Sequence, residues 1–327
     1  MQKLCFTSVA MIAVGLLAWP ALAQTAATTS DGATAATAPP RTPWGAPDLQ
    51  GTWDYRTITP LERPRDLDDR EFFTEEEIAE RETAAAARLD APPDEDSGFI
   101  TIHAPYWTDP GRYLLEGGRT SLVVDPPDGR VPSLTSEAVV RQAANRPPAR
   151  PDSYEDRSPY ERCITRGLPQ AILPGLYNNN IHIVQTPGYV AVVHEMVHET
   201  RIVPVDGRPH LASALRTWFG DSRGRWEGET LVVETVNFSG RMPFRGAGEN
   251  LRVVERFTRL AADTLGYEIT FEDPTTWTRS WTAAYPMRPS EGPIYEYACH
   301  EGNYGLANIL EVARDERAAE AAAAAAR

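Results

Sequence analysis

The chain has 327 residues and a formal net charge of −14, and this length suffices for one large domain or two modest ones with a sizeable core. Because the balance is so acidic, binding to nucleic acid or to an anionic membrane is not expected. Lysine occurs only at position 3, so chemistry that needs an ε-amine, such as Schiff-base formation, pyridoxal phosphate attachment or a P-loop, is excluded for the rest of the chain.

The first 23 residues have the pattern of a signal peptide. Lys3 supplies a positive charge, a mostly apolar run follows from residue 9 to 19, and Ala21-Leu22-Ala23 matches the A-x-A cleavage pattern. The apolar run is too short for a transmembrane helix, and no longer run follows it. We therefore expect cleavage after Ala23 and a periplasmic or secreted protein without an integral membrane segment.

The next part of the chain predicts a flexible lead-in and then a segment rich in loops and helices. Residues 24–42 are mostly Ala, Thr and Ser with few bulky side chains, which is typical of a linker. Within residues 43–175, the capping box TEEE predicts a helix over 75–89. A second helix is expected over 136–144.

Residues 176–310 differ in composition and are typical of strands. They are rich in Val, Ile, Thr and aromatic residues, and turn signals such as PG, DG and DP separate the runs. The expected strands are IHIVQT, YVAVVHEMVHETRIVPV, ETLVVETVNF, LRVVERFTRL, TLGYEITFED and TTWTRSWTAAYPM. We predict a mainly β fold, an antiparallel meander that forms a lipocalin-like barrel or a strongly curved sheet, because closure removes exposed edges. Residues 43–175 would wrap this barrel, and the alanine-rich residues 311–327 would form a helical tail.

The string HEMVH at residues 194–198 has the spacing of a zinc-protease helix. A zinc site needs His194 and His198 on one helical face, with Glu195 beside the metal as base. In a strand the two histidines would share a face but lie roughly 13 Å apart at ~3.3 Å per residue, too far for one zinc ion. The surrounding β-branched residues favour a continuous strand over residues 189–205. We therefore expect neither metal nor cofactor, with a zinc-dependent hydrolase as an alternative.

In the strand interpretation, Glu195 approaches a different histidine. If a tight turn forms at PG, His182 falls opposite Val193 and shares a face with Glu195, about 7–8 Å away by Cα. Arg201 would continue that face, whereas the two histidines of the motif would lie on the other. A His–Glu pair on a sheet surface can act as a general acid/base couple in a pocket. A structural hydrogen bond or a solvated rim is the alternative.

The string GDSRG at residues 220–224 matches the G-x-S-x-G nucleophile elbow, which requires a helix after the serine. Two glycines and a strand-like run follow the serine instead. We therefore expect a turn that enters a strand.

The string CHEGNYG, residues 299–305, concentrates hydrogen-bonding groups next to a cysteine. Two cysteines follow the signal peptide, and Cys163 and Cys299 are expected to form a disulfide in an oxidising compartment, with two separate buried thiols as the alternative. Because loops on a rigid scaffold often carry function, His300 and Glu301 are candidates for catalysis. Further candidate ligand-binding residues are Asn180, His198, Arg201, Asn303 and Tyr304.

Three strings are long enough to be specific: GDSRGRWEGETLVVETVNF, FEDPTTWTRSW and YEYACHEGNYG. With others between residues 43 and 310, they resemble a large family of exported bacterial proteins of unknown function. The resemblance implies export and a shared fold. Gly51-Thr52-Trp53 is separately similar to the G-x-W opening of lipocalins.

Aromatic residues suggest what the protein binds. Eight tryptophans and twelve tyrosines suit a concave site for a small apolar or aromatic molecule, and equally suit a large β core. We predict an exported protein that binds or transforms such a molecule by cofactor-independent acid/base chemistry of the lyase, isomerase or hydratase type. His182 and Glu195 would carry the protons, with Arg201 and the His300-Glu301 loop as orienting groups. A non-catalytic periplasmic carrier with a deep apolar cavity is the alternative.

Overall fold

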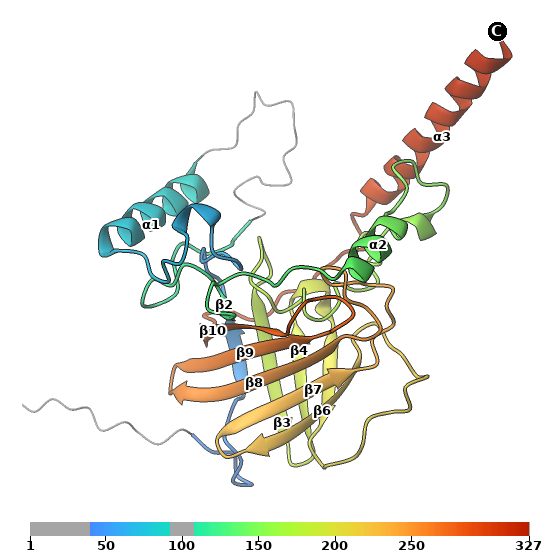
Figure 1. Cartoon of the computed structure of the whole chain (residues 1–327). Helices are drawn as coiled ribbons and strands as arrows, with labels where there is room; N and C mark the ends of the chain where they lie inside the picture. Colours follow the sequence, from blue (N-terminus) through green and yellow to red (C-terminus); the bar gives the residue numbers. More distant parts are fainter. Residues whose placement is uncertain (1–39, 92–107, 327) are drawn as a thin grey trace, which may run out of the picture. The chain divides into compact units, whose positions relative to one another are not determined.

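The computed structural model describes residues 40–91 and 108–326, and an antiparallel sheet forms its core (Figure 1). The strands are β1 (Gly51–Asp54), β2 (Val123–Asp125), β3 (Asn180–Thr186), β4 (Tyr189–His194), β5 (Thr200–Pro204), β6 (Asp221–Glu227), β7 (Thr230–Val236), β8 (Arg252–Ala261), β9 (Thr264–Glu272) and β10 (Trp281–Pro289). The helices are α1 (Glu75–Asp90), α2 (Ser136–Ala144) and α3 (Tyr304–Ala325), with short 3₁₀ turns η1 (Arg65–Leu67), η3 (Tyr154–Asp156) and η4 (Met196–His198). None of these helices is both long and apolar enough to cross a membrane. The predicted signal peptide and nearly all of the predicted linker lie outside the described residues.

The strands form one sheet whose two ends meet. Neighbours follow the order β5-β4-β3-β1-β10-β9-β8-β7-β6, every pair is antiparallel, and β2 pairs with β10. In the part of the chain that the structure describes, the end strands β5 and β6 lie side by side without a hydrogen-bonded ladder. The sheet is therefore a nearly closed barrel, which confirms the predicted fold class.

A glycine allows the two end strands to approach. Gly224 is a buried position of β6, and a methyl group there would lie 2.7 Å from Val205 Cγ1 and 3.0 Å from Val203 Cγ1. The first distance is shorter than carbon atoms tolerate and the second is tight, so a larger residue would require the valine side chains or the strands to shift. The seam of the barrel thus depends on one residue without a side chain.

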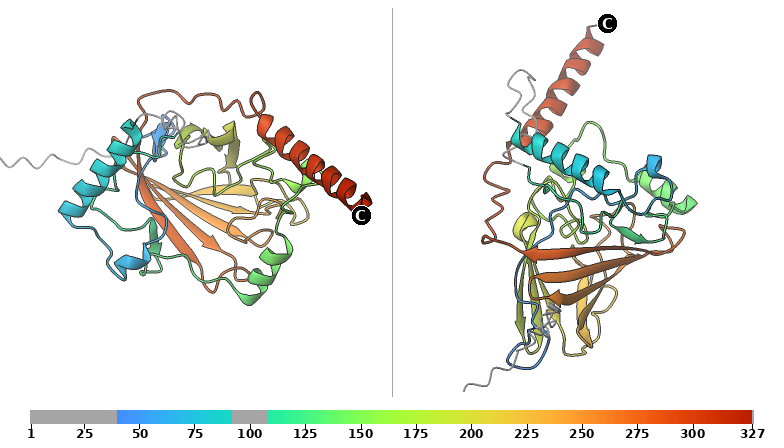
Figure 2. Two further views of the ribbon diagram at one scale, coloured as in Figure 1. Left: turned by 90° about the horizontal axis from the view of Figure 1, so that it is seen from above. Right: turned by 90° about the vertical axis from the view of Figure 1, so that its left-hand side faces the viewer.

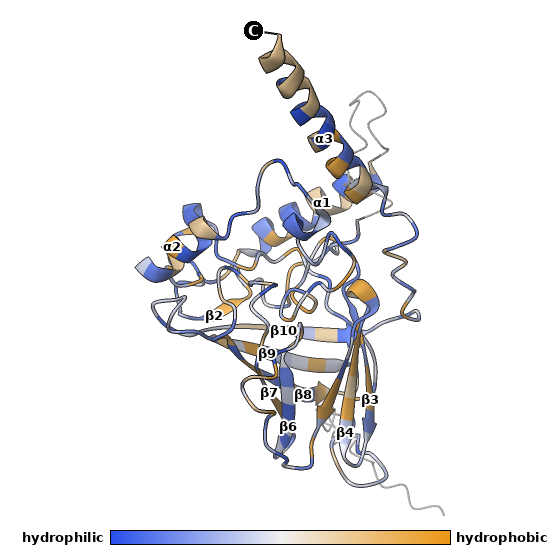
Figure 3. Cartoon of the chain, turned by 90° about the vertical axis from the view of Figure 1, so that its right-hand side faces the viewer, coloured by the Kyte–Doolittle hydropathy of each residue, from blue (hydrophilic) through white to orange (hydrophobic). Residues whose placement is uncertain are grey.

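Inward-facing side chains of the strands supply the core. Buried and half-buried positions alternate along β9, where Leu265, Tyr267, Ile269 and Phe271 are buried. Figure 3, coloured by hydropathy, shows both hydrophobic and hydrophilic residues on the strands. Phe271 stacks on Trp281 with 4.0 Å between ring centroids, and both belong to a larger aromatic group with Phe244 and Trp277. The interior of the barrel is therefore a packed core.

Two helices begin where their sequence signals place them. Thr74 and Glu77 form the expected capping box, in which each side chain accepts the other residue's backbone N–H, and α1 follows. The second helix, α2, covers residues 136–144 as predicted, and the Thr135 hydroxyl caps it. Figures 1 and 2 show that α1, α2 and α3 lie at the same end of the barrel. Helices and loops thus cover that end.

The segment before residue 176 also contributes to the sheet. β1 lies between β3 and β10, with Thr52 opposite His182 and Asp54 opposite Arg288. Residues 43–175 therefore supply a strand of the barrel as well as the expected helices and loops.

The predicted continuous strand over residues 189–205 is wrong. β4 ends at His194, β5 begins at Thr200, and the two strands pair as an antiparallel hairpin. Val197 and His198 have φ angles of 60° and 43°, in the left-handed region that a strand cannot use. The His194 N–H donates to the carbonyl of Glu199, which closes the turn. The HEMVH string is thus a hairpin turn.

Candidate functional site

A short segment fills the covered end of the barrel. Residues 167–174, which we call the plug, contribute Ala171 and Ile172 to the buried core. Tyr55 Oη donates to the Ala171 carbonyl at 3.0 Å, and Tyr285 Oη donates to the Ile172 carbonyl. Burial raises the pKa of both tyrosines, so both hydroxyls stay protonated donors at neutral pH. Tyr285 on β10 and Tyr55, just after β1, therefore hold the plug through its backbone carbonyls.

A cavity of about 130 Å³, which we call the mouth cavity, lies against the outer side of the plug. Its apolar walls come from Tyr55, Leu173, Pro174, Tyr177 and Met196. Its polar walls come from Arg166, Gln170, Asn178 and Asn179. An apolar cavity with a few convergent polar groups is typical of a small-molecule site.

Arg166 is the charged wall of the mouth cavity. Among the residues that the structure describes, its guanidinium has neither a hydrogen bond nor an ion pair, and its Nε is buried without a partner. The guanidinium lies over the ring of Tyr160, 4.2 Å from the centroid. Tyr160 Oη lies 2.6 Å from Tyr177 Oη and 3.2 Å from Tyr297 Oη. A connected group of three tyrosines thus supports the arginine.

Glu195 does not line the cavity itself but directly precedes Met196, which does, at the start of the turn between β4 and β5. It is 5% exposed, and Asn180 Nδ2 donates to its Oε2 at 2.8 Å. Burial raises the pKa of Tyr55 most, the negative charge of Glu195 raises it further, and the positive charge of Arg166 lowers it. The carboxylates of Glu195 and Asp54 and the guanidinium of Arg166 therefore act on the same phenol. Asn180 Oδ1 is buried without a partner among the described residues.

The predicted register of His182 is confirmed, but its pairing with Glu195 is not found. His182 lies opposite Val193, and its Nδ1 makes a 2.9 Å hydrogen bond with Thr52 Oγ1. Glu195 turns to Asn180 instead, because β4 has ended and the strand alternation no longer applies. No hydrogen bond joins His182 and Glu195 in the described chain. His182 is half-buried on the sheet, whereas Glu195 is buried in the turn after β4.

The prediction that Arg201 shares a face with His182 and Glu195 is wrong. Arg201 lies opposite Val192, so it faces the barrel interior, where it is 5% exposed. It forms an ion pair with the fully buried Glu255 on β8, with 2.8 Å between Nη2 and Oε1. Tyr267 Oη donates to Glu255 Oε1 at 2.9 Å. Arg201 therefore links opposite walls of the barrel.

The two histidines of the HEMVH string point to different places. His194 is fully buried, its Nδ1–H donates to the plug at Ala171 O over 3.4 Å, and its Nε2 has no partner among the described residues. Burial and the charge of Arg201 lower the pKa of His194 to about 3. His198 is exposed, with its Nδ1 3.1 Å from Tyr297 O. The described residues contain no group of three or more His, Cys, Asp or Glu that could hold a metal ion.

The predicted disulfide between Cys163 and Cys299 is confirmed, and it points to an oxidising compartment. It joins the loop before the plug to the segment that carries Tyr297. The other candidates of the CHEGNYG loop lie apart from the mouth cavity. His300, Glu301 and Tyr304 are exposed, whereas Asn303 caps α3 and donates from Nδ2 to the Glu161 carbonyl at 2.9 Å.

The GDSRG string lies on a strand and does not form a nucleophile elbow. Gly220 has a φ of 73° and turns the chain into β6, where Ser222 Oγ makes a 2.8 Å hydrogen bond with Thr235 Oγ1 inside the barrel. The expected turn before a strand is therefore present, although the strand it enters was not predicted.

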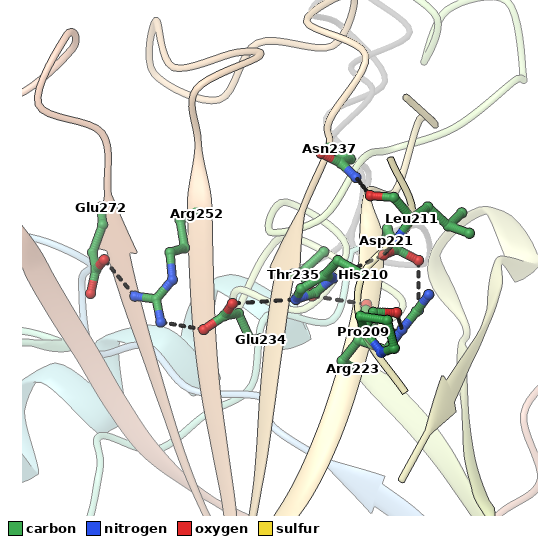
Figure 4. A network of polar contacts seen from close by, with 11 residues as sticks. Pro209, His210, Leu211, Asp221, Arg223, Glu234, Thr235, Asn237, Arg252 and Glu272 are labelled. Atoms are coloured by element: carbon green, nitrogen blue, oxygen red, sulfur yellow. Dashed lines mark hydrogen bonds and ion pairs between the residues drawn. The ribbon is translucent and has the colours of Figure 1, made fainter. Parts of the chain in front are cut away.

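A polar network on the outer face of the sheet was not expected from the sequence (Figure 4). His210 Nδ1 lies 2.8 Å from Asp221 Oδ2, and its Nε2 lies 3.2 Å from Glu234 Oε1. Arg252 continues the network from Glu234. These contacts fasten the loop between β5 and β6 to the sheet, so we interpret them as structural.

Sequence reasoning missed the principal residues of the mouth cavity, which are Tyr55, Arg166, Tyr177 and Met196. Only the tertiary fold brings them together, and no spacing in the sequence indicates that residues 166–179 return to β1 and to the turn after β4. The chain matches no family model, no curated protein and no solved structure.

Proposed function

We propose that the protein is exported and binds a small molecule with an apolar or aromatic body in the mouth cavity. The observation that carries this proposal is a cavity with apolar walls and a guanidinium that has no hydrogen bond or ion pair among residues 40–91 and 108–326. Its volume of about 130 Å³ is close to the roughly 150 Å³ of an engineered cavity that binds benzene. A ligand, or the part of it that enters, is therefore about the size of one aromatic ring.

Acid/base chemistry at this site would involve Glu195 and Tyr55. Glu195 is a buried carboxylate that lies near the Tyr55 phenol, and the phenol lines the cavity. A carboxylate base beside a neutral hydroxyl donor supports proton transfer of the lyase, isomerase or hydratase type. A pure carrier would instead use a deep apolar cavity, whereas the interior of this barrel is packed with side chains. The arrangement therefore favours an enzyme over a carrier.

The binding proposal can be tested with benzyl alcohol as the probe and ligand-observed NMR on the full chain. We expect saturation transfer to the probe with the natural sequence. Gln170→Trp should weaken binding about tenfold or more, because a half-buried wall residue then fills the cavity. Ile202→Trp, at an exposed position of β5, is the control and should bind normally. Absence of transfer with the natural sequence, or equal binding by Gln170→Trp, would contradict the proposal.

A further inference from the structure

Arg166 lacks the partner that a buried donor normally has. Its Nε is buried without a hydrogen bond among the described residues, although the side chain lines a cavity. A buried donor without a partner costs about 1–3 kcal/mol relative to a paired one, and more where the group is charged. Proteins therefore rarely keep such a group unless something else supplies the acceptor. Arg166 is half-buried and lines the cavity, so the remaining N–H groups of its guanidinium can donate to a ligand bound there.

The surroundings of Arg166 hold it in place without neutralising it. Its guanidinium stacks on the ring of Tyr160, which supplies a flat support. Hydrogen bonds to Tyr177 and Tyr297 fix the Tyr160 hydroxyl, and burial raises the pKa of both partner tyrosines. Tyr177 and Tyr297 therefore stay neutral at physiological pH. A planar guanidinium matches a carboxylate with two parallel hydrogen bonds.

The nearby negative charge defines the orientation of an anion. Glu195 accepts a hydrogen bond from Asn180, acts on Tyr55 through its charge, and forms no ion pair with Arg166 among the described residues. An anionic group in the cavity is attracted to the guanidinium and repelled by Glu195. Its apolar body then lies against Leu173, Pro174 and Met196.

We propose that the ligand of the mouth cavity is a small monocarboxylate with an apolar or aromatic body, and that Arg166 binds its carboxylate; this rests on the proposed function. The net charge of −14 repels anions from most of the surface. Binding of an anionic ligand would therefore indicate a specific positively charged site. A carboxylate is the anion that fits best, because the cavity offers one planar guanidinium and room for about one ring.

The test compares benzoate with benzamide, its neutral counterpart of similar shape, in titrations of the full chain at low ionic strength. We expect benzoate to bind at least about tenfold more tightly than benzamide. Arg166→Gln should remove this preference, and an unchanged urea unfolding midpoint shows that the variant is folded. Arg166→Lys, which keeps the charge and loses the planar fork, should give an intermediate preference.

The matched control is Arg162→Gln. Arg162 also lies over a tyrosine ring, that of Tyr154, at 5.0 Å, but it does not line the cavity. This variant should keep the full preference for benzoate. Equal affinities of the natural chain for benzoate and benzamide, or a preference that survives Arg166→Gln, would overturn the carboxylate assignment while leaving the binding proposal intact. If neither probe binds to the natural chain, the binding proposal fails and the carboxylate assignment fails with it.

Discussion

Several charged or titratable side chains are buried inside the barrel, and each must be stabilised there. Arg201 and Glu255 are both buried and pair with each other, and Tyr267 donates a further hydrogen bond to the carboxylate. Removing one member of such a pair is costly because the other charge stays buried, by about 3–5 kcal/mol in typical cases. His194 has no acidic partner among the described residues, and burial and the charge of Arg201 keep its imidazole neutral. Arg201 and Glu255 are therefore stabilised as an ion pair, whereas His194 is stabilised as a neutral imidazole.

His194 should make the protein sensitive to acid. Its pKa is lowered to about 3 in the folded chain by burial and by Arg201, against an ordinary value of 6.5. Below pH 6.5 His194 is protonated in the unfolded chain but not in the native chain, so the free energy of unfolding falls as the pH drops toward 3. His194→Leu removes this term. Between pH 7 and pH 4 the natural chain should lose on the order of 3 kcal/mol more stability than the variant, measured by urea unfolding.

The control for this prediction is the exposed histidine of the same turn. His198→Asn keeps a residue that tolerates the left-handed backbone, with φ 43°. It should show the same acid dependence as the natural chain, since His198 is exposed. Parallel pH curves for His194→Leu and the natural chain would show that His194 does not titrate as its burial requires.

At the scale of elements, the seam between β5 and β6 depends on Gly224. Gly224→Ala would place a methyl group 2.7 Å from Val205 Cγ1 and push the two strands apart. We expect a loss of about 1–3 kcal/mol in the free energy of unfolding, as for other overpacked sites. Gly188→Ala is the control, because nothing lies within 4 Å of the added carbon, and it should change stability by less than about 0.5 kcal/mol. Equal urea midpoints for both variants would refute this account of the seam.

Elements governed by local signals were predictable from the sequence, and those governed by distant contacts were not. The capping box before α1 and the tight turn that places His182 opposite Val193 are local, and both are confirmed. The break between β4 and β5 is not local in this sense. The turn there is stabilised by Asn180, whose carbonyl accepts the Glu195 N–H and whose side chain binds the Glu195 carboxylate. The β-branched residues around 194–199 favour a continuous strand, and they do not indicate that Asn180 will bind Glu195.

At the scale of the whole molecule, the candidate site arises where distant parts of the chain meet. β1 contributes Tyr55 just after its end, the loop before β3 contributes Arg166 and Tyr177, and the turn after β4 contributes Met196. Barrel closure, which the sequence did predict in outline, brings these segments together. Their side chains could not be assigned to one site beforehand, because no periodicity relates residues of separate loops.

The disulfide links two distant parts of the chain covalently: Cys163 and Cys299 are 136 residues apart in the sequence. Cross-linking so long a loop restricts the unfolded chain, so replacing both residues by serine should lower the free energy of unfolding by about 2–5 kcal/mol. Tyr297 lies two residues before Cys299 and contacts Tyr160, so the double variant should also bind benzyl alcohol more weakly. The natural chain treated with a dithiol reductant should match the double variant in urea unfolding. If both retain the stability of the oxidised chain, the noncovalent contacts of this segment suffice and the disulfide contributes little.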